Sequence, residues 1–367
     1  MKLTIICKEL LRGLTQASSC VESRLALPIL STVLFRLDGN MLSLTATNLE
    51  VEVTSRTQVE DAADFIPIAV AVRKLLDTCK NLPPDAVLTM AIQNNKASVS
   101  AGRGCYNFAM LPAEEFPLMD DEAAEVEFSI EQNQLKYLFE RTQFAVAQQD
   151  VRFFLNGLLW EISGNAFAAA GADGHRMAYA SIKLGELNLT KQRVIVPRDA
   201  IHELSRLLES TDSTVDIKIS SGHVSVAGDN FVFRTKLIES TFPEYHVLLK
   251  VLAPNSFVAN KNELKQILTR SAIFTSDQFH TIRVNLSQNL MQVVAKNAAL
   301  EESSEELEIE YQGDAISLGF NVKYLLDCLA IVDSDKVKFS FSDGERNVFI
   351  GALNPEDSIY SVMPIRL

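Results

Sequence analysis

Ala71-Val72-Arg73-Lys74-Leu75-Leu76-Asp77 recurs 250 positions later as Asn321-Val322-Lys323-Tyr324-Leu325-Leu326-Asp327. Both copies keep apolar residues at helical spacing and a basic residue at the same place, which predicts two equivalent amphipathic helices. A weaker middle copy, Pro197-Arg198-Asp199-Ala200-Ile201, lies between them. Repetition of this kind indicates a chain built from several copies of one structural unit.

Each of these helices leads into a pair of alternating segments. Alternation of apolar and polar residues is typical of strands, and turn residues between two such runs predict a β-hairpin. The three hairpins are expected at 86–101, 214–228 and 336–351, with turns at Asn94-Asn95, Ser221-Gly222 and Asp343-Gly344.

The first half of each unit repeats as well. Helical patterns at about 6–20, 130–148 and 261–275 place Leu10, Leu135 and Leu264 at equivalent positions. Hairpin sequences follow at 33–46, 158–170 and 282–295. The unit is therefore strand, helix and strands, twice over, and three such units account for the whole chain.

Two linkers divide the chain into three domains. Residues 112–127 are acidic and contain two prolines, and 240–256 hold the second linker. We expect domains at 1–122, 127–246 and 247–367. The alternation of strands and helices would also suit a parallel α/β enzyme, but the tight hairpins favour antiparallel sheets with helices on one face. We predict an α+β fold of three repeated domains, each with two helices on antiparallel sheets.

The charge of the chain is unevenly distributed. Its formal net charge of -13 repels phosphate on average. The six predicted helices nevertheless hold 13 Lys and Arg against 9 Asp and Glu, while acid concentrates in 112–127 and 301–310. A ring with basic lining helices and an acidic rim would need this segregation. Ordinary solvated helix faces would give the same count.

Targeting and metal signals point to a cytoplasmic protein. Lys8, Glu9 and Arg12 interrupt the N-terminal apolar run before it is long enough for a signal peptide, and no segment approaches a membrane span. Five scattered cysteines lack C-x-x-C spacing, which favours reduced thiols and argues against a zinc site. We expect no metal and no cofactor.

One segment resembles catalytic chemistry. Asp173-Gly174-His175-Arg176 places an acid, a base and a cation beside a flexible glycine, so an α/β enzyme using Asp173 and His175 is one alternative. The same position in the other repeats is held by Thr47-Asn48 and Lys296-Asn297. A turn at the end of a strand is the better interpretation, and a scaffold of three domains that forms no ring is the other alternative.

Several motifs, in order along the whole chain, resemble the bacterial sliding clamp family, the β subunits of DNA polymerase III. Besides Asp173-Gly174-His175-Arg176, they are Leu27-Pro28-Ile29-Leu30, Leu111-Pro112-Ala113-Glu114-Glu115-Phe116-Pro117, Leu155-Asn156-Gly157, Phe242-Pro243-Glu244-Tyr245 and Val362-Met363-Pro364-Ile365-Arg366-Leu367. Any one of these motifs is weakly specific. Their order and separations, with the repeat beneath them, make the resemblance specific.

The resemblance implies a head-to-tail homodimer whose helices line a hole and whose sheets form the outer wall. Such a ring encircles double-stranded DNA without reading its sequence and catalyses nothing. It tethers the DNA polymerase III α subunit, clamp-loader subunits and other proteins that carry a clamp-binding motif. The expected location is the cytoplasm, at the nucleoid, with no membrane partner.

The resemblance also implies three sets of site residues. Candidate DNA contacts, which lie mainly on or beside the helices, are Arg12, Arg24, Arg73, Gln149 and Arg198. The apolar pairs Ile273/Phe274 and Tyr106/Phe108 would meet at the dimer seam, flanked by Lys74 and Arg103 facing acids of 301–306. A peptide pocket would use Leu155, Ala172, Gly174, His175, Arg176, Met177, Pro243, Val247, Asn321, Tyr324, Val362, Met363, Pro364, Ile365, Arg366 and Leu367.

Some positions depart from the family pattern. Ala172 stands where threonine is common, Met177 where leucine is usual, and Val247 where an arginine often lies. These replacements keep the pocket apolar and remove polar contacts, so they bear on which peptides it accepts. Phe153 and Phe154 replace tyrosines that can touch DNA in relatives.

Overall fold

The structure is a computed structural model of the chain. It describes residues 2–21, 27–63, 65–93, 96–185, 189–249, 253–276, 278–342, 347–353 and 357–366. By their contacts the residues form two compact units, one of Met1–Asn133 with Asp199–Leu237 and one of Gln134–Arg198 with Ile238–Leu367.

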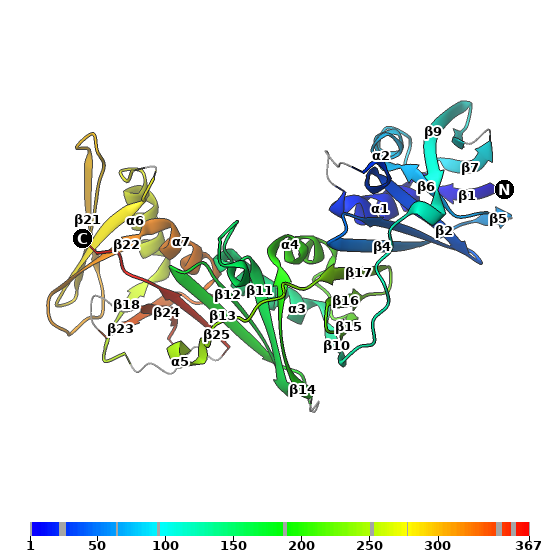
Figure 1. Ribbon diagram of the computed structural model, residues 1–367. Helices are drawn as coiled ribbons and strands as arrows, with labels where there is room; N and C mark the ends of the chain where they lie inside the picture. Colours follow the sequence, from blue (N-terminus) through cyan, green and yellow to red (C-terminus); the bar gives the residue numbers. More distant parts are fainter. Residues whose placement is uncertain are drawn as a thin grey trace. The chain divides into compact units, whose positions relative to one another are not determined.

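Three repeats of one element order run along the chain (Figure 1). The first repeat contains β1 (Lys2–Ile6), α1 (Cys7–Ala17), β2 (Thr32–Asp38), β3 (Met41–Thr47), β4 (Val51–Gln58), the short β5 (Asp61–Ala63), β6 (Ile68–Ala71), α2 (Val72–Lys80), β7 (Val87–Gln93), β8 (Lys96–Ala101) and β9 (Gly104–Pro112).

The other repeats follow the same order. The middle repeat contains β10 (Val126–Glu131), α3 (Gln132–Thr142), β11 (Gly157–Gly164), β12 (Ala166–Ala172), β13 (Arg176–Lys183), β14 (Leu189–Pro197), α4 (Arg198–Leu207), β15 (Thr214–Ile219), β16 (His223–Ala227) and β17 (Phe231–Lys236). The last contains β18 (Asn255–Asn260), α6 (Lys261–Ala272), β19 (Thr281–Ser287), β20 (Leu290–Lys296), β21 (Glu302–Glu308), β22 (Ile316–Asn321), α7 (Val322–Ile331), β23 (Lys336–Phe341), β24 (Val348–Ala352) and β25 (Ser358–Val362).

The predicted fold class is confirmed. All six predicted helices are present, and Leu10, Leu135 and Leu264 are each buried on their helix, at 1%, 0% and 2% exposure. All six predicted hairpins pair antiparallel, so the parallel alternative is wrong. The turns predicted at Asn94-Asn95 and Asp343-Gly344 lie outside the described residues.

The predicted helix ends were too long. Residues after Thr142 keep apolar side chains at helical spacing, but α3 ends at Thr142 and a 3-10 turn follows at Gln143–Ala145. Thr142 itself donates its hydroxyl to the carbonyl of Leu138. A short helix in the second linker, α5 (His246–Leu249), was not predicted.

The sheets continue from one repeat into the next. In one unit, β17 of the middle repeat pairs with β4 of the first, within a sheet of 13 strands. In the other unit, β25 of the last repeat pairs with β13 of the middle, within a sheet of eight strands. The middle repeat therefore shares strands with both units, while the predicted bounds of the three domains stay a prediction.

Helices cover one face of these sheets. α1 and α2 pack together over β2, β3 and β4, and α6 and α7 pack together in the last repeat. Thirty buried residues, including Leu264, Ile267 and Leu325, form the core of that last repeat and its neighbouring strands. Each amphipathic helix thus buries its apolar face and leaves its charged face in water.

Within the described residues, no helix is long and apolar enough to span a membrane. Nor do the described His, Cys, Asp and Glu side chains form a group of three or more that could hold a metal ion. The five cysteines are free, and all but Cys105 are buried.

Candidate functional site

An apolar cavity of about 240 Å³ opens in the unit formed by Gln134–Arg198 and Ile238–Leu367. Its walls come from the loop before β11, the turn between β12 and β13, the second linker and the chain end. The residues that line it are Arg152, Phe154, Leu155, Ala172, Gly174, His175, Arg176, Met177, Phe242, Pro243, Glu244, Tyr245, Asn347 and Met363.

The turn between β12 and β13 is held by a side chain. The Asp173 carboxylate accepts hydrogen bonds from the backbone N–H groups of His175 and Arg176, both at 2.9 Å. Asn48 holds the equivalent turn of the first repeat in the same way. Asn297 does so in the last repeat. Such turns are a common role of Asp and Asn, so the structure supports the interpretation of Asp173 as a turn residue.

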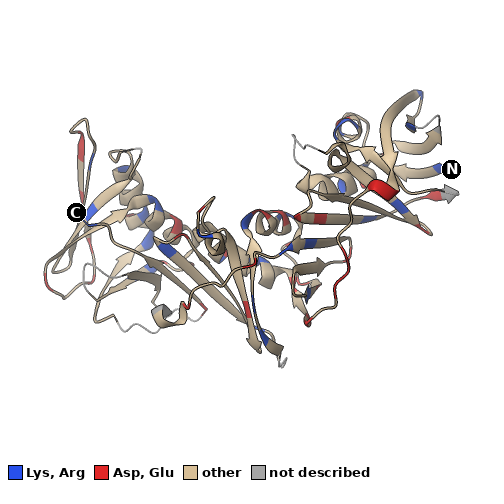
Figure 2. Ribbon diagram, viewed as in Figure 1, with Lys and Arg blue, Asp and Glu red and all other residues tan. Residues whose placement is uncertain are grey.

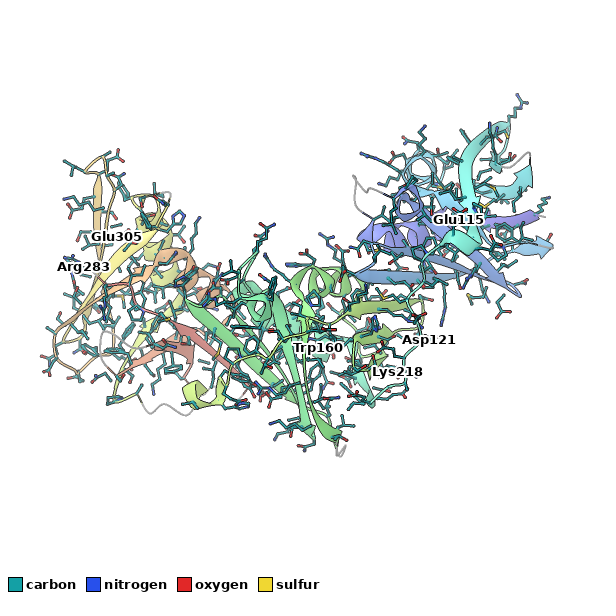
Figure 3. The ribbon with its side chains drawn as sticks, viewed as in Figure 1. Glu115, Asp121, Trp160, Lys218, Arg283 and Glu305 are labelled. Atoms are coloured by element: carbon teal, nitrogen blue, oxygen red, sulfur yellow. The ribbon has the colours of Figure 1, made fainter. Side chains whose placement is uncertain are left out.

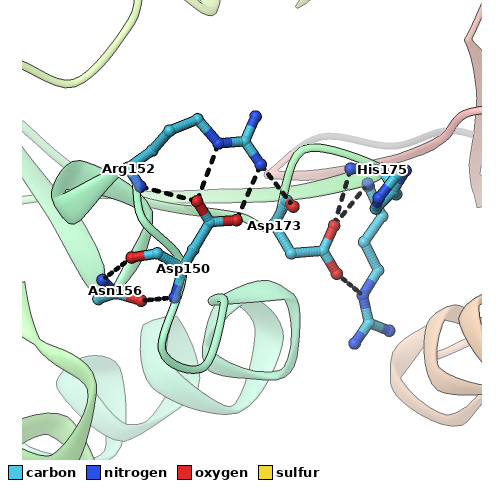
Figure 4. Close-up of polar contacts among 6 residues, drawn as sticks. Asp150, Arg152, Asn156, Asp173 and His175 are labelled. Carbon is cyan, nitrogen blue, oxygen red and sulfur yellow. Dashed lines mark hydrogen bonds and ion pairs between the residues drawn. The ribbon is translucent and has the colours of Figure 1, made fainter.

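The loop before β11 forms the second wall (Figure 4). Asp150 accepts from the backbone N–H and Nε of Arg152, at 2.8 and 3.0 Å, and these bonds lower the pKa of Asp150 to about 2. Asn156 closes the loop through two 2.8 Å bonds to the Asp150 backbone. The guanidinium of Arg152 then lies against Gly174, where an added Cβ would meet it. Gly174 also has a φ of +88°, a conformation that favours glycine.

Arg176 is locked beneath the cavity. It pairs with Asp173 at 3.0 Å and with Asp327 of α7, and it donates to the carbonyl of Phe144 at 2.8 Å. Its guanidinium also lies 4.4 Å from the ring centroid of Tyr324, which stacks against His175. Burial opposes the charge, but the two carboxylates raise the pKa of Arg176. The charge is therefore matched within the protein, and the cavity presents mainly apolar surface to a ligand.

The chain end reaches the same cavity. Val362 is fully buried opposite Arg176 in the sheet, and the Met363 N–H donates to the carbonyl of His175 at 2.8 Å. Met363 is 45% exposed. Ile365 pairs with Gly319 of β22 instead, through a backbone bond of 2.8 Å. A flexible, half-exposed methionine suits an adaptable apolar surface.

Half of the predicted pocket residues line the cavity. Leu155, Ala172, Gly174, His175, Arg176, Met177, Pro243 and Met363 do so. The remaining described ones do not line it: Val247 is exposed on α5, Asn321 caps α7, Tyr324 packs behind His175, Val362 is buried, and Pro364, Ile365 and Arg366 follow Met363. Leu367 lies outside the described residues.

Sequence reasoning missed six lining residues. They are Arg152, Phe154, Phe242, Glu244, Tyr245 and Asn347. Three of them belong to the motif Phe242-Pro243-Glu244-Tyr245, so the sequence did hold a signal. Phe154 packs edge-on against Phe242, with ring centroids 6.4 Å apart.

Three of the candidate DNA contacts, Arg12, Arg73 and Arg198, lie on helices. Arg12 is exposed on α1 and pairs with Glu9 at 3.1 Å, and Arg73 is exposed on α2. Arg198 is half-buried at the start of α4. Gln149 lies in a loop with a φ of 55°. Arg24 lies outside the described residues.

The candidate seam residues differ in exposure. Ile273 is 75% exposed at the end of α6, but Phe274 packs partly against the core of its own repeat. Lys74 and Arg103 are exposed and Tyr106 is half-buried. Phe108 is only 6% exposed, because it belongs to the core of the first repeat.

Two strands that could meet at a seam have an unpaired side among the described residues. β21 is the edge of its sheet, with Glu302, Glu306 and Glu308 exposed. β9 pairs with β8 along 104–109 and with β6 only at 110–112. Not all acids near β21 are free, because Glu305 forms an ion pair with Arg270.

Charge follows the elements as the sequence suggested. Figure 2 shows Lys and Arg on the helices and Asp and Glu along the first linker. Arg73, Lys74 and Lys80 of α2 are all exposed. The helices therefore carry local positive charge on a chain whose total is negative.

Three domain models of one protein family match the chain in order. The DNA polymerase III beta subunit models match with their N-terminal domain at residues 1–120, central domain at 129–244 and C-terminal domain at 253–366. The chain is 39% identical to the beta sliding clamp of Pseudomonas aeruginosa, 38% to that of Vibrio cholerae and 35% to that of Escherichia coli K12. Each comparison covers the whole of both chains.

Solved structures agree with the sequence matches. The DNA polymerase III subunit beta of Pseudomonas aeruginosa superimposes with a TM-score of 0.97 at 39% identity, over the whole of both chains. A second structure of that sliding clamp, with a TM-score of 0.96 at 39% identity and the same full coverage, is bound to griselimycin. The pol III beta of Caulobacter crescentus gives a TM-score of 0.94 at 27% identity, again over both whole chains.

Proposed function

The chain belongs to the DNA polymerase III β subunit family of sliding clamps, and we propose that two copies of it form a ring-shaped homodimer that encircles duplex DNA. The family is the non-catalytic processivity factor of the polymerase, so the enzyme alternative is wrong. The three family models, matched in order over nearly the whole chain, carry this conclusion.

Topology, and not affinity, would hold such a ring on DNA. Non-specific electrostatic binding has a Kd of roughly 10⁻⁴ to 10⁻⁶ M at physiological salt, which releases DNA quickly. Escape from a closed ring instead requires a protein interface to open. The net charge of -13 is compatible with this function, because the ring needs to slide along DNA and not to grip it.

Five side chains would face the DNA inside the ring: Arg12, Arg24, Arg73, Gln149 and Arg198. Arg12 and Arg73 are exposed on α1 and α2, which supports the proposal for these two. Long basic side chains in water can contact passing phosphates without fixing the DNA in one register.

The seam would form between β9 of one copy and β21 of the other. The unpaired side of each strand supports this proposal, since pairing would cover both edges. Ile273 of one copy and Tyr106 of the other would make an apolar contact across the seam. Lys74 and Arg103 would face the exposed acids of β21. Phe274 and Phe108 would support these contacts from their own cores.

The apolar cavity would hold a peptide of a partner protein. Its apolar lining, matched internal charges and half-exposed Met363 support this use. Partners would be the DNA polymerase III α subunit, clamp-loader subunits and other replication and repair proteins. Griselimycin, which binds the Pseudomonas aeruginosa clamp, would bind here and serves as a probe.

The domain bounds 1–122, 127–246 and 247–367 remain our proposal, as does a cytoplasmic location at the nucleoid. The element order supports three domains, although β10 begins at Val126, one residue before the proposed second domain, and α5 (His246–Leu249) crosses the proposed bound between 246 and 247. The location is supported by the DNA-encircling role.

Retention on DNA of two topologies tests the function. Loaded by a clamp loader, the protein should stay on nicked circular DNA through gel filtration and leave once a single cut linearises the circle. The double variant Ile273→Asp with Phe274→Asp should be monomeric in sedimentation equilibrium and should not be retained. Equal loss of the wild-type protein from circular and linear DNA would overturn the ring.

A further inference from the structure

The second linker forms one wall of the apolar cavity but has no regular structure there. Residues 237–245 connect β17 to α5, and Phe242, Pro243, Glu244 and Tyr245 of this segment line the cavity. The segment begins with backbone bonds from the N–H groups of Leu237 and Ile238 to the carbonyls of Gly222 and Ile195, both at 2.9 Å, and ends its backbone bonding with a 2.8 Å bond from the Ser240 N–H to the Ile238 carbonyl. Beyond that point, side chains must hold the wall in place.

A buried carboxylate provides the anchor. Glu161 of β11 is 8% exposed and lies directly opposite Arg193 of β14 in the sheet register. It accepts a hydrogen bond from the hydroxyl of Tyr245 at 3.0 Å. Burial and the charge of Glu161 raise the pKa of Tyr245, so the hydroxyl stays protonated and donates. Arg193 Nε lies 3.4 Å from the same carboxylate. A buried carboxylate is tolerated only with such partners.

Arg193 extends this anchor to the linker. It pairs with the carboxylate of Glu244 and lies 3.5 Å from the carbonyl oxygen of Pro243. The hydrogen bond and charge of Arg193 lower the pKa of Glu244. His246 completes the group, with ring nitrogens 3.4 Å from Glu161 and 3.5 Å from Glu244. Two strands of the sheet thus hold three consecutive residues of the linker.

The anchored side chains then order the aromatic wall. Tyr245 is 3% exposed and packs edge-on against Phe242, with ring centroids 6.2 Å apart, and against Tyr179 at 5.6 Å. Phe242 in turn contacts Phe154 across the cavity. Glu161 and Arg193 are not among the described residues that line the cavity. They lie behind its wall.

We propose that Glu161 and Arg193 are positioning residues of the peptide pocket. They hold the wall Phe242–Tyr245 in the shape that accepts a ligand and set the affinity without touching the ligand. A wall that is already ordered loses less conformational freedom when the ligand binds, so the ligand binds more tightly. The inference rests on the pocket of the proposed function.

Calorimetric titration of the full-length protein with griselimycin tests the proposal. Arg193→Ala should weaken binding about tenfold, because the wall would then have to become ordered when the ligand binds. Arg193→Lys keeps the charge beside Glu244 and should recover part of the affinity. Arg234→Ala removes the similar arginine of β17, which pairs with Asp121 of the first linker, and should leave the affinity unchanged.

Folding is followed separately in each variant. The single tryptophan, Trp160 (Figure 3), is fully buried on β11 and precedes Glu161 in the sequence, so unchanged emission shows that the strand remains packed. If Arg193→Ala perturbs this emission, Glu161→Gln replaces it, because glutamine keeps an acceptor for Tyr245 while losing the charge beside Arg193. That variant should also weaken binding, by less.

The outcomes separate this proposal from the pocket itself. If Met363→Asp, a change within the cavity, leaves griselimycin binding intact, the proposed pocket is wrong. If Met363→Asp abolishes binding while a folded Arg193→Ala binds as tightly as the wild type, the pocket stands and the positioning role is refuted. Equal weakening by Arg193→Ala and Arg234→Ala would also refute it, because the effect would then be general.

Discussion

The two junctions between the three repeats are built on one plan. β17 pairs with β4 at the first, and β25 pairs with β13 at the second. Each is crossed by a linker that contains a Phe-Pro pair, and Phe116 and Phe242 are buried at 6% and 5% exposure. At each, a turn held by an Asp or Asn side chain receives the end of the neighbouring repeat: Glu50 accepts from Lys236, and His175 accepts from Met363.

Even the anchoring of the linkers is alike. Glu52 lies opposite Arg234 in the first junction, as Glu161 lies opposite Arg193 in the second. Arg234 of β17 pairs with Asp121 of the first linker and lies 3.5 Å from the carbonyl oxygen of Met119. Figure 3 labels Asp121. A cross-strand pair of opposite charges, reaching out to a linker, is therefore a repeated device of this fold.

The cavities nevertheless differ. The first linker encloses about 80 Å³ lined by polar groups such as Glu122, Ser220 and Arg234, while the second encloses about 240 Å³ with an apolar lining. Asp121 and Glu122 follow the first Phe-Pro pair closely, whereas the buried Tyr245 follows the second. The fold alone does not make a peptide pocket. Local side chains decide which junction has one.

The largest difference is expected from the buried aromatics. Tyr245→Ala should destabilise the protein by about 3–5 kcal/mol and abolish griselimycin binding, because both the wall and the hydroxyl partner of Glu161 are lost. Phe116→Ala should cost a similar free energy of unfolding, since Phe116 packs against Leu34 and Ala69, but should leave binding intact. Urea unfolding and calorimetric titration measure the two effects.

The milder change Tyr245→Phe distinguishes a local loss of the wall from global unfolding. Tyr245→Phe keeps the ring and leaves Glu161 without one of its partners, which costs about 1–3 kcal/mol. Its affinity should lie between those of Tyr245→Ala and the wild type. If Tyr245→Ala and Phe116→Ala reduced binding equally, the assignment of the pocket to the second junction alone would be wrong.

A smaller difference is expected from the turns. The Asp173 and Asn48 turns are alike, but the residue after the capping side chain is Gly174 in one and Leu49 in the other, with φ values of 88° and 77°. Gly174→Ala should cost about 1–2 kcal/mol of stability and weaken griselimycin binding, because the new Cβ displaces Arg152. Leu49→Gly should change stability by less than about 1 kcal/mol and binding not at all.

Thermal unfolding and titration of both turn variants check this pair. Unchanged binding by Gly174→Ala would show that Arg152 can move away freely and does not shape the pocket. Weaker binding by Leu49→Gly would show that the two junctions are coupled, although they belong to different compact units.

Much of the fold could be predicted because periodicity repeats three times. The equivalence of Val72 and Val322, each the first residue of its helix, follows from sequence alone, as does the turn at Asp173. The full lining of the cavity was harder to predict from the sequence. Tyr245 and Arg152 line the cavity from segments outside helices and strands, where side-chain contacts that the sequence pattern does not reveal help to fix the position. Phe108 of β9 is only 6% exposed, and a buried residue and an interface residue look alike in sequence, so its place at the seam stays a prediction.

The smallest expected difference concerns the buried acid of the first junction. Glu52 is 4% exposed, and burial raises its pKa despite the N–H of Met119 at 2.9 Å and the nearby Arg234. The folded state then binds the Glu52 proton more tightly than the unfolded state. Stability falls as pH rises from the ordinary glutamate pKa through the raised value, and the loss persists at neutral pH.

Glu52→Gln removes this penalty while keeping an acceptor for Met119. The variant should be more stable than the wild type at pH 7, by less than about 1 kcal/mol because the weak pairing with Arg234 at 3.7 Å is lost as well. The gap should close as pH falls toward the ordinary glutamate pKa, where wild-type Glu52 is itself protonated. Urea midpoints of both proteins between pH 5 and 8 measure it. A variant that is less stable at pH 7, with a deficit that shrinks at low pH, would instead show that the Glu52 charge stabilises the junction through Arg234.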